Sequence, residues 1–159
     1  PVSITSPVGM NMVLRDSTHA DTTLTFEHYP PGFTFPLVEA ASGHLFLALA
    51  SDDTVEEVIR WMRETDAGEE SLAHFPTRAT LNLIRERGYA LTAWGRYNLN
   101  PGRTSAIAVP IYRRGTFEAA LTLIFFASAM TQETAVSRYM DKLKATATAI
   151  SNAISSAAD

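Results

Sequence analysis

The 159-residue sequence predicts an α+β fold, in which an antiparallel sheet carries helices on its faces. Apolar residues alternate in the first third and again after residue 89, helical patterns fill the middle, and a long apolar seam ends the chain. The resulting order, β-β-α-α-α-β-β-β-α, lacks the strict alternation of a parallel doubly wound sheet. Because the length suits one core, we expect residues 1–159 to form a single domain.

Two strands are expected near the start of the chain. Apolar or aromatic residues occupy every second position over 10–15 and over 23–28, the period of a strand with one buried face. The polar stretch 16–19 suits the turn between them. The segment Pro30-Pro31-Gly32 ends the second strand, because proline has no N–H to donate to a sheet.

Three helices are expected next. Residues 40–50 are small or apolar, as in a buried helix. Ser51 is placed to cap a second helix, whose apolar residues recur between Val55 and Met62. After a loop at 67–70, a third helix ends at Gly88, since glycine readily adopts the left-handed conformation that follows a helix.

Three further strands are expected at 89–94, 105–112 and 117–126, the last two joined by a short hairpin turn. From Ala119 onward the third, 117–126, is apolar on both faces except at Thr122, which indicates a central strand. Pro110 indicates a sheet edge or a bulge at its position.

One long helix is expected from about Gln132 to the end. Its apolar residues recur at alternate steps of four and three, which places them on one side of a helix. They are Val136, Met140, Leu143, Ala147, Ile150 and Ile154. This seam suits packing on the sheet or on another subunit.

The composition excludes several kinds of function. The chain has no cysteine, which rules out disulfides, thiolate zinc sites and thiol nucleophiles. Its net charge of −4 comes from interspersed charges without a basic stripe, so we expect this chain alone to bind DNA poorly. The sequence has no signal peptide and no apolar run of the roughly 20 residues that span a membrane. We therefore expect a cytoplasmic protein without membrane contact.

The sequence also lacks a recognisable catalytic or metal-binding motif. It contains no P-loop, nucleophile elbow or dinucleotide fingerprint, and its four histidines have no metal-ligand spacing. Asp52-Asp53 suits a helix start and Glu69-Glu70 a solvated loop better than an acid/base pair. We expect neither an enzyme nor a bound cofactor or metal.

One segment suits ligand binding. Ala41-Ser42-Gly43-His44 opens an apolar helix, and the unpaired N–H groups of a helix start attract carboxylate or phosphate. On spacing alone, simple capping of the helix by Ser42 is the more economical explanation. The residue patterns by themselves predict an α+β ligand-binding domain.

Several segments together resemble the C-terminal domain of the IclR family of bacterial transcription regulators. They are Pro36-Leu37 with 40–48, Ile84-Arg85-Glu86-Arg87-Gly88-Tyr89-Ala90, Ile107-Ala108-Val109-Pro110-Ile111, and Ala149-Ile150-Ser151. The resemblance implies a curved antiparallel sheet like that of GAF and PAS sensors, flanked by helices. It also implies a small-molecule carboxylate effector and self-association as a dimer or tetramer. In that family DNA is bound by an N-terminal winged helix-turn-helix domain, which this sequence lacks.

The resemblance places the effector pocket on positions from four segments. These positions are Ala41, Ser42, Gly43, Thr92, Ala106, Thr122 and Ile124. Two further pocket positions depart from the family pattern, because His44 replaces a frequent lysine or arginine and Trp94 replaces a frequent glutamate. An indole in place of a carboxylate implies a larger, less polar cavity. The resemblance therefore favours an aromatic acid, such as those of the hydroxybenzoate or hydroxyphenylpropionate pathways.

Two other functions remain open at this stage. A small enzyme acting on an aromatic acid would need a perturbed acid/base pair, and none is visible. A GAF-type sensor of another small molecule would need a cysteine for a bilin or more cationic groups for a nucleotide. We also expect at least a dimer, because the apolar residues in 45–50 and 55–62 suit a partner surface.

Overall fold

The computed structural model describes residues 1–23, 29–65, 72–92 and 104–157. Within them, six strands form one antiparallel sheet in the order β3-β2-β1-β6-β5-β4. The strands are β1 (Val2–Val8), β2 (Asn11–Ser17), β3 (Thr34–Pro36), β4 (Ala90–Thr92), β5 (Thr104–Arg113) and β6 (Thr116–Phe126). The helices are α1 (Ala41–Leu49), α2 (Asp52–Glu64), α4 (Arg78–Arg87) and α5 (Gln132–Ser156), with short 3-10 turns η1 (His19–Asp21) and η2 (Leu37–Glu39). The expected α+β fold, a curled antiparallel sheet with flanking helices, is confirmed.

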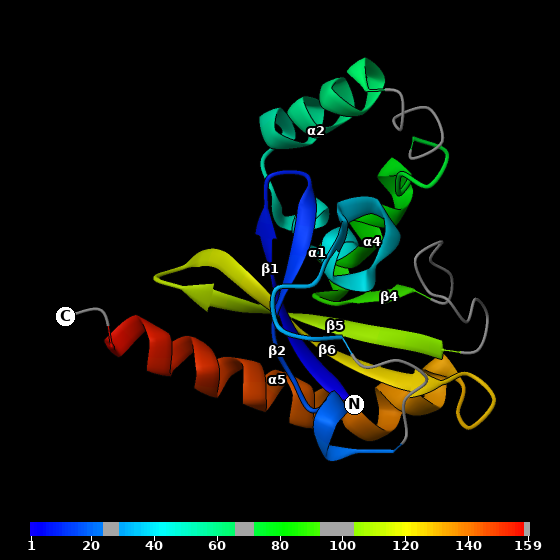
Figure 1. The fold of residues 1–159 in the computed structure, drawn as a ribbon, viewed down its shortest axis with the longest axis vertical. Coiled ribbons are helices and arrows are strands. Elements are labelled where there is room, and N and C mark those ends of the chain that lie inside the picture. The colour runs from blue at the N-terminus through cyan, green and yellow to red at the C-terminus, as the bar shows by residue number, and fades with distance from the viewer. Residues whose placement is uncertain (24–28, 66–71, 93–103, 158–159) are drawn as a thin grey trace.

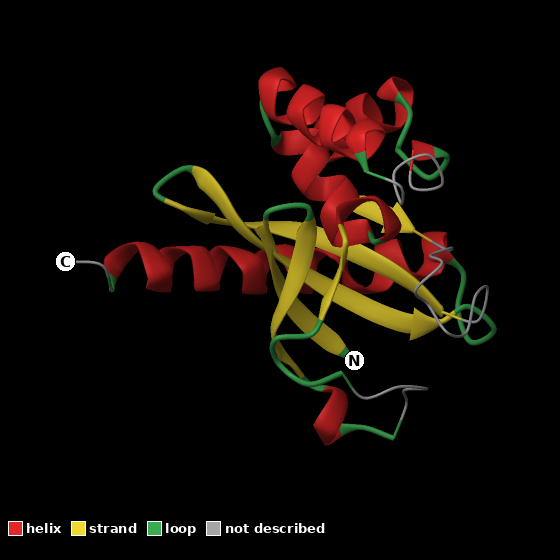
Figure 2. Ribbon diagram, turned by 45° about the horizontal axis from the view of Figure 1, so that its top comes forward, coloured by secondary structure: helices red, strands yellow, loops and turns green. Residues whose placement is uncertain are grey.

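The sheet separates two layers of helices. Figure 1 and Figure 2 show α5 on one side of the sheet and α1 with α4 on the other, while α2 lies farther from the sheet. Successive side chains of a strand point to opposite faces. Ala108 and Ala120 accordingly pack in the core under α1, whereas Ile107 and Leu121 pack with α5. We call these two surfaces of the sheet the α1 face and the α5 face.

Strand β1 is a central strand that the sequence patterns did not predict. It pairs with β2 on one side and with β6 on the other. Val2 and Ile4 belong to the core against α5, and Ser3 and Thr5 are buried on the α1 face. The alternation covers only four residues before Pro7, which is too short for a periodic signal.

The sheet differs from expectation in two other places. Strand β3 has only three residues and was not predicted. The strand expected at 23–28 falls almost entirely outside the described residues, which leave out 24–28. The helix expected at 40–50 is present as α1.

Pro110 lies at an uncovered edge, as predicted. Strand β4 pairs only with residues 106–108 of β5, so no described strand covers β5 beyond them on that side. Proline fits this edge because it has no N–H to satisfy. Further along the same edge, helix α5 supplies an acceptor, and the Tyr112 N–H donates to Ser151 Oγ at 2.9 Å.

The predicted hairpin and the final helix are confirmed. Arg114 and Gly115 join β5 to β6 with φ of 50° and 83°, and positive φ at both positions is the mark of a type I′ turn. All six residues of the predicted apolar seam belong to the core that α5 forms with the sheet. The seam therefore packs on the sheet within one chain.

The burial of residues in α1 and α2 corrects part of the expectation that these helices present apolar surfaces to a partner. Leu45, Leu47 and Ala48 of α1 are fully buried in the core, so these three residues are not available to a second subunit, whereas Phe46 and Leu49 are only partly buried. In α2, Val58 and Met62 are buried as well, but Trp61 remains 46% exposed. Within the described residues no helix is long and apolar enough to cross a membrane.

Candidate functional site

The strand register brings the predicted pocket positions of β4, β5 and β6 into neighbouring rows of the sheet. Thr92 of β4 pairs with Ala106 of β5, which pairs with Ile124 of β6. In the next row across the sheet, Ala108 pairs with Thr122. Four predicted positions therefore lie in two adjacent rows. Trp94, the fifth predicted position from this region, lies outside the described residues.

Strand β1 extends these rows with hydroxyl side chains. Ser3 is the partner of Thr122, and Thr5 is the partner of Ala120 in the following row. Ser3, Thr5 and Thr122 are 5%, 2% and 6% exposed. The Thr5 and Thr122 hydroxyls have no hydrogen-bond partner among the described residues. Leaving a buried hydroxyl unpaired costs about 1–3 kcal/mol, so this region is polar at the expense of stability.

Sequence reasoning missed Ser3 and Thr5 because it missed β1. The available signal was the alternation of Val2 and Ile4 with these two hydroxyl residues. Only the pairing of the first strand with β6 shows that they lie beside Thr122.

The first turn of α1 lacks a side-chain cap. Its N-cap residue is Ala40, and Ser42 lies inside the helix with 2% of its surface exposed. The explanation of this segment as capping by Ser42 is therefore wrong. The other helices are capped in the ordinary way, for example α2 by Ser51, whose Oγ accepts from the Thr54 N–H at 3.2 Å.

Three backbone donors remain at the start of α1. The His44 N–H donates to the Ala40 carbonyl at 3.0 Å, which closes the first turn. The N–H groups of Ala41, Ser42 and Gly43 make no hydrogen bond to another described residue. They point along the positive end of the helix dipole, where an anion is stabilised.

Gly43 is required by the way α1 packs on η2. A Cβ atom at this position would lie 1.8 Å from the Leu37 carbonyl oxygen and 2.5 Å from its carbon. No side chain fits in that space. The glycine therefore fixes how closely the first turn of α1 approaches the preceding segment.

The His44 side chain ties the same two segments together. Its Nε2–H donates to the Val38 carbonyl at 2.7 Å. Burial lowers the pKa of His44, and the hydrogen bond to Val38 acts in the opposite direction. His44 occupies a position where the family often has lysine or arginine. Its side chain is instead uncharged, and it positions α1.

This assignment predicts a pH-dependent stability. The unfolded chain takes up a proton at His44 near the ordinary pKa of 6.5, and the folded chain does so only at lower pH. The contribution of His44 to stability is therefore complete above that value and is lost as the pH falls below it. We expect the free energy of unfolding in urea to fall more between pH 7.5 and pH 5.5 in the wild type than in His44→Gln, whose glutamine keeps a donor for Val38. An equal fall in both proteins would contradict the assignment of His44 as a neutral, buried group.

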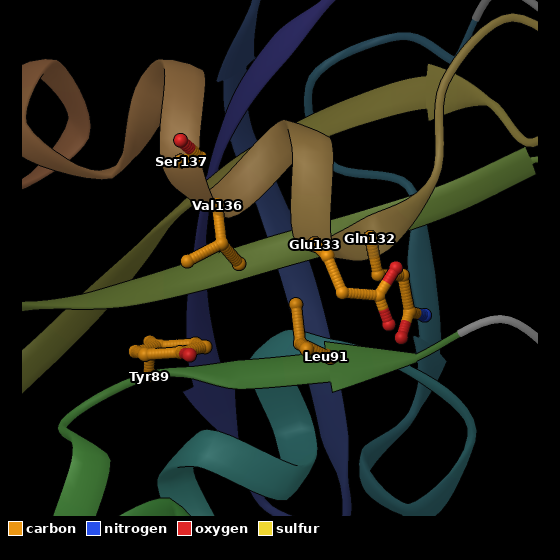
Figure 3. Close-up of a pocket in the computed structure, with 6 residues that line it drawn as sticks. All are labelled: Tyr89, Leu91, Gln132, Glu133, Val136 and Ser137. Carbon is orange, nitrogen blue, oxygen red and sulfur yellow. The ribbon is translucent and has the colours of Figure 1, made fainter.

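A hollow lies on the α5 face. It has a volume of about 290 Å³ and is lined by Tyr89, Leu91, Gln132, Glu133, Val136 and Ser137. Figure 3 shows Tyr89 and Leu91 on the β4 side, facing Val136 and Glu133 of α5. Hydrogen bonds from the helix start and from Thr131 lower the pKa of Glu133, which keeps this carboxylate charged. A negative charge at the wall disfavours an acid in this hollow, although solvent screens the exposed Glu133 carboxylate.

Comparison with known proteins agrees with this architecture. Residues 17–152 match the family model described as "Bacterial transcriptional regulator IclR C-terminal". The IclR structure from Thermotoga maritima is 22% identical with a TM-score of 0.75, over 97% of this chain and 61% of that chain. The IclR transcriptional regulator from Alicyclobacillus acidocaldarius is 25% identical with a TM-score of 0.72, over 97% of this chain and 60% of that chain.

A third structure is similar over most of its own length. The C-terminal domain of the E. coli transcriptional regulator KdgR is 21% identical with a TM-score of 0.70, over 97% of this chain and 87% of that chain. The present chain spans only about three fifths of the length of the T. maritima and A. acidocaldarius chains. The family match is to regulators, in agreement with the prediction that the chain is not an enzyme.

Proposed function

The chain belongs to the IclR family of bacterial transcriptional regulators as its C-terminal, effector-binding domain, and we propose that it binds a small aromatic carboxylic acid between α1 and the sheet. The carboxylate is held by the N–H groups of Ala41, Ser42 and Gly43. The rest of the ligand lies on the α1 face beside Ala106, Thr122 and Ile124. Since the sheet joins strands from both ends of the sequence, we also propose that residues 1–159 form one domain.

The observation that carries this proposal is the uncapped start of α1. Three adjacent donors without acceptors among the described residues, together with the positive end of the helix dipole, favour the two oxygens of one carboxylate. A carboxylate accepts two such bonds at once, and hydrogen bonds to a charged group are stronger than neutral ones. The site therefore recognises an acid without a cationic side chain from α1.

The sheet surface supports an aromatic or otherwise apolar body for the ligand. Ala106 and Ile124 are only partly buried although they face the layer that contains α1. Small and apolar side chains in one row provide a flat surface against which a ring packs. The indole of Trp94, expected in the pocket from the family pattern, would add to this apolar surface.

A thermal-shift screen of paired compounds tests the proposal. Each acid, for example benzoate or 3-phenylpropionate, is compared with its own neutral amide. A ligand that binds only the folded state raises the melting temperature. We expect at least one acid to stabilise the protein in a saturable way while its amide does not. Equal effects of acids and amides, or no effect of any acid, would refute the carboxylate site.

We further propose that the chain self-associates, and predict a dimer or tetramer. The support is the family likeness together with two exposed apolar side chains, Trp61 of α2 at 46% and Leu83 of α4 at 51%. Large exposed apolar residues on helices suit a protein contact. Sedimentation equilibrium at micromolar concentration should give a multiple of 17.4 kDa. A single species of 17.4 kDa would contradict the prediction.

A further inference from the structure

We propose that Thr5 of β1 and Thr122 of β6 form a pair of hydroxyls that binds a second, uncharged polar group of the effector, such as a hydroxyl or a carbonyl oxygen. The inference rests on the proposed function, because it needs an acid bound on the α1 face. It adds Thr5, which the sequence patterns did not place in the pocket, and it restricts the class of acid.

The two threonines are neighbours on one face. Thr5 pairs with Ala120 and Thr122 pairs with Ser3, so the threonines are diagonal partners on adjacent antiparallel strands. Residues in this relation lie roughly 7–8 Å apart at Cα and both reach the same side of the sheet. A single small group that displaces the atoms now covering them would be within reach of both hydroxyls.

Both hydroxyls are buried and unpaired. Thr5 is 2% exposed and Thr122 6%, and neither Oγ1 has a hydrogen-bond partner among the described residues. Buried polar atoms in proteins are nearly always paired, so two such atoms on one diagonal call for a partner. Valine has the same shape and would fill either position without an unpaired atom. A ligand oxygen supplies the partner that packing alone does not.

Strand β2 carries a bulge directly opposite Thr5. The pairing of β1 with β2 shifts between Ile4, opposite Asp16, and Thr5, opposite Leu14, which leaves Arg15 without a partner in the register. Such a bulge bends the strand and turns the neighbouring side chains, and bulges are over-represented beside functional sites. The bulge is an observation independent of the unpaired hydroxyls, and it lies on the strand next to Thr5.

The surroundings of the pair define the chemical class of its ligand. The sheet partners around the two threonines are Ser3, Leu14, Ala108 and Ala120, and all four are uncharged. A second carboxylate placed here would be buried without a compensating charge among them. The pair therefore selects hydroxy or oxo acids over both plain acids and dicarboxylic acids.

The test compares Thr5→Val and Thr122→Val with the wild type, by calorimetric titration with matched probes. The probes are 3- and 4-hydroxybenzoate against benzoate, and 3-hydroxybutyrate against butyrate. We expect one hydroxylated probe to bind the wild type more tightly than its parent acid. Each substitution should weaken binding of that probe by roughly 3- to 10-fold and leave the parent acid within about twofold. Thr116→Val, at the exposed start of β6, is the control and should change neither affinity.

The unfolding midpoint in urea provides a second readout. Removing an unpaired hydroxyl should leave the midpoint of the ligand-free protein unchanged or higher, whereas removing a paired one lowers it. The pair is overturned if Thr5→Val lowers the midpoint, or if parent acids bind and Thr5→Val leaves the preference for hydroxylated probes intact. In the latter case the proposed function stands. If none of the acids binds the wild type, the proposed function fails and the pair fails with it.

Discussion

Gly43→Ala is expected to lower the free energy of unfolding by more than about 3 kcal/mol, or to prevent folding altogether. The added Cβ would meet the Leu37 carbonyl oxygen at 1.8 Å, and its neighbours there are backbone atoms rather than a flexible side chain. Relief requires α1 to move away from η2, which would break the bond from His44 Nε2 to the Val38 carbonyl and disturb the core under α1. Urea denaturation followed by circular dichroism measures the loss.

Gly88→Ala is the matched control for this substitution. Gly88 has φ of 75°, and a Cβ added there would have no other atom within 4 Å, so alanine is destabilised only by this backbone conformation. That strain costs about 1–2 kcal/mol. A loss at Gly43 no larger than the loss at Gly88 would show that α1 does not pack on η2 as closely as described.

Ala41→Pro is expected to weaken carboxylate binding by roughly 10- to 100-fold without unfolding the protein. Ala41 is the first residue of α1, where proline is tolerated because its missing N–H has no partner in the helix. The preceding Ala40 has φ of −135° and ψ of 153°, the extended conformation that a residue before proline adopts. The substitution therefore removes one of the three proposed donors while its backbone suits the helix. Because Ala41 is buried, the added ring atoms also lower the free energy of unfolding by about 1–3 kcal/mol, which circular dichroism of the variant checks.

Arg78→Pro makes the same change at the first residue of α4, which is exposed. It should leave the affinity of an acid identified in the thermal-shift screen unchanged. Calorimetric titration of both variants with that acid separates loss of a donor from any general effect of proline. Full affinity in a folded Ala41→Pro variant would remove the N–H groups of α1 from the binding site.

Local sequence patterns predicted the features that depend on residues close in sequence. The cap at Ser51, the left-handed Gly88 and the apolar seam of α5 each depend on residues within a few turns of one another, and each is found as expected. The pocket positions predicted on β4, β5 and β6 rest on the resemblance to a family. The register explains why they come together, because Thr92, Ala106 and Ile124 occupy one row across three strands.

The features that escaped prediction depend on contacts between distant segments. Ser3 and Thr5 become pocket candidates only because the first strand inserts between β2 and β6, and no local signal specifies that pairing. Serine is a common capping residue, but here the helix begins at Ala41 and Ser42 lies inside it. Gly43 allows this first turn to lie close to Leu37. The uncapped donors of α1 are thus a consequence of tertiary packing.

The most direct test of the account is an amide NMR titration of the ¹⁵N-labelled protein with a stabilising acid and with its neutral amide. We expect saturable shifts of the Ala41, Ser42 and Gly43 amide signals with the acid alone, because their N–H groups receive the carboxylate. Smaller shifts should occur at Thr122 and Thr5 on the facing sheet. Shifts centred on Tyr89 and Val136 at the hollow on the α5 face, with the three α1 amides unmoved, would contradict the account.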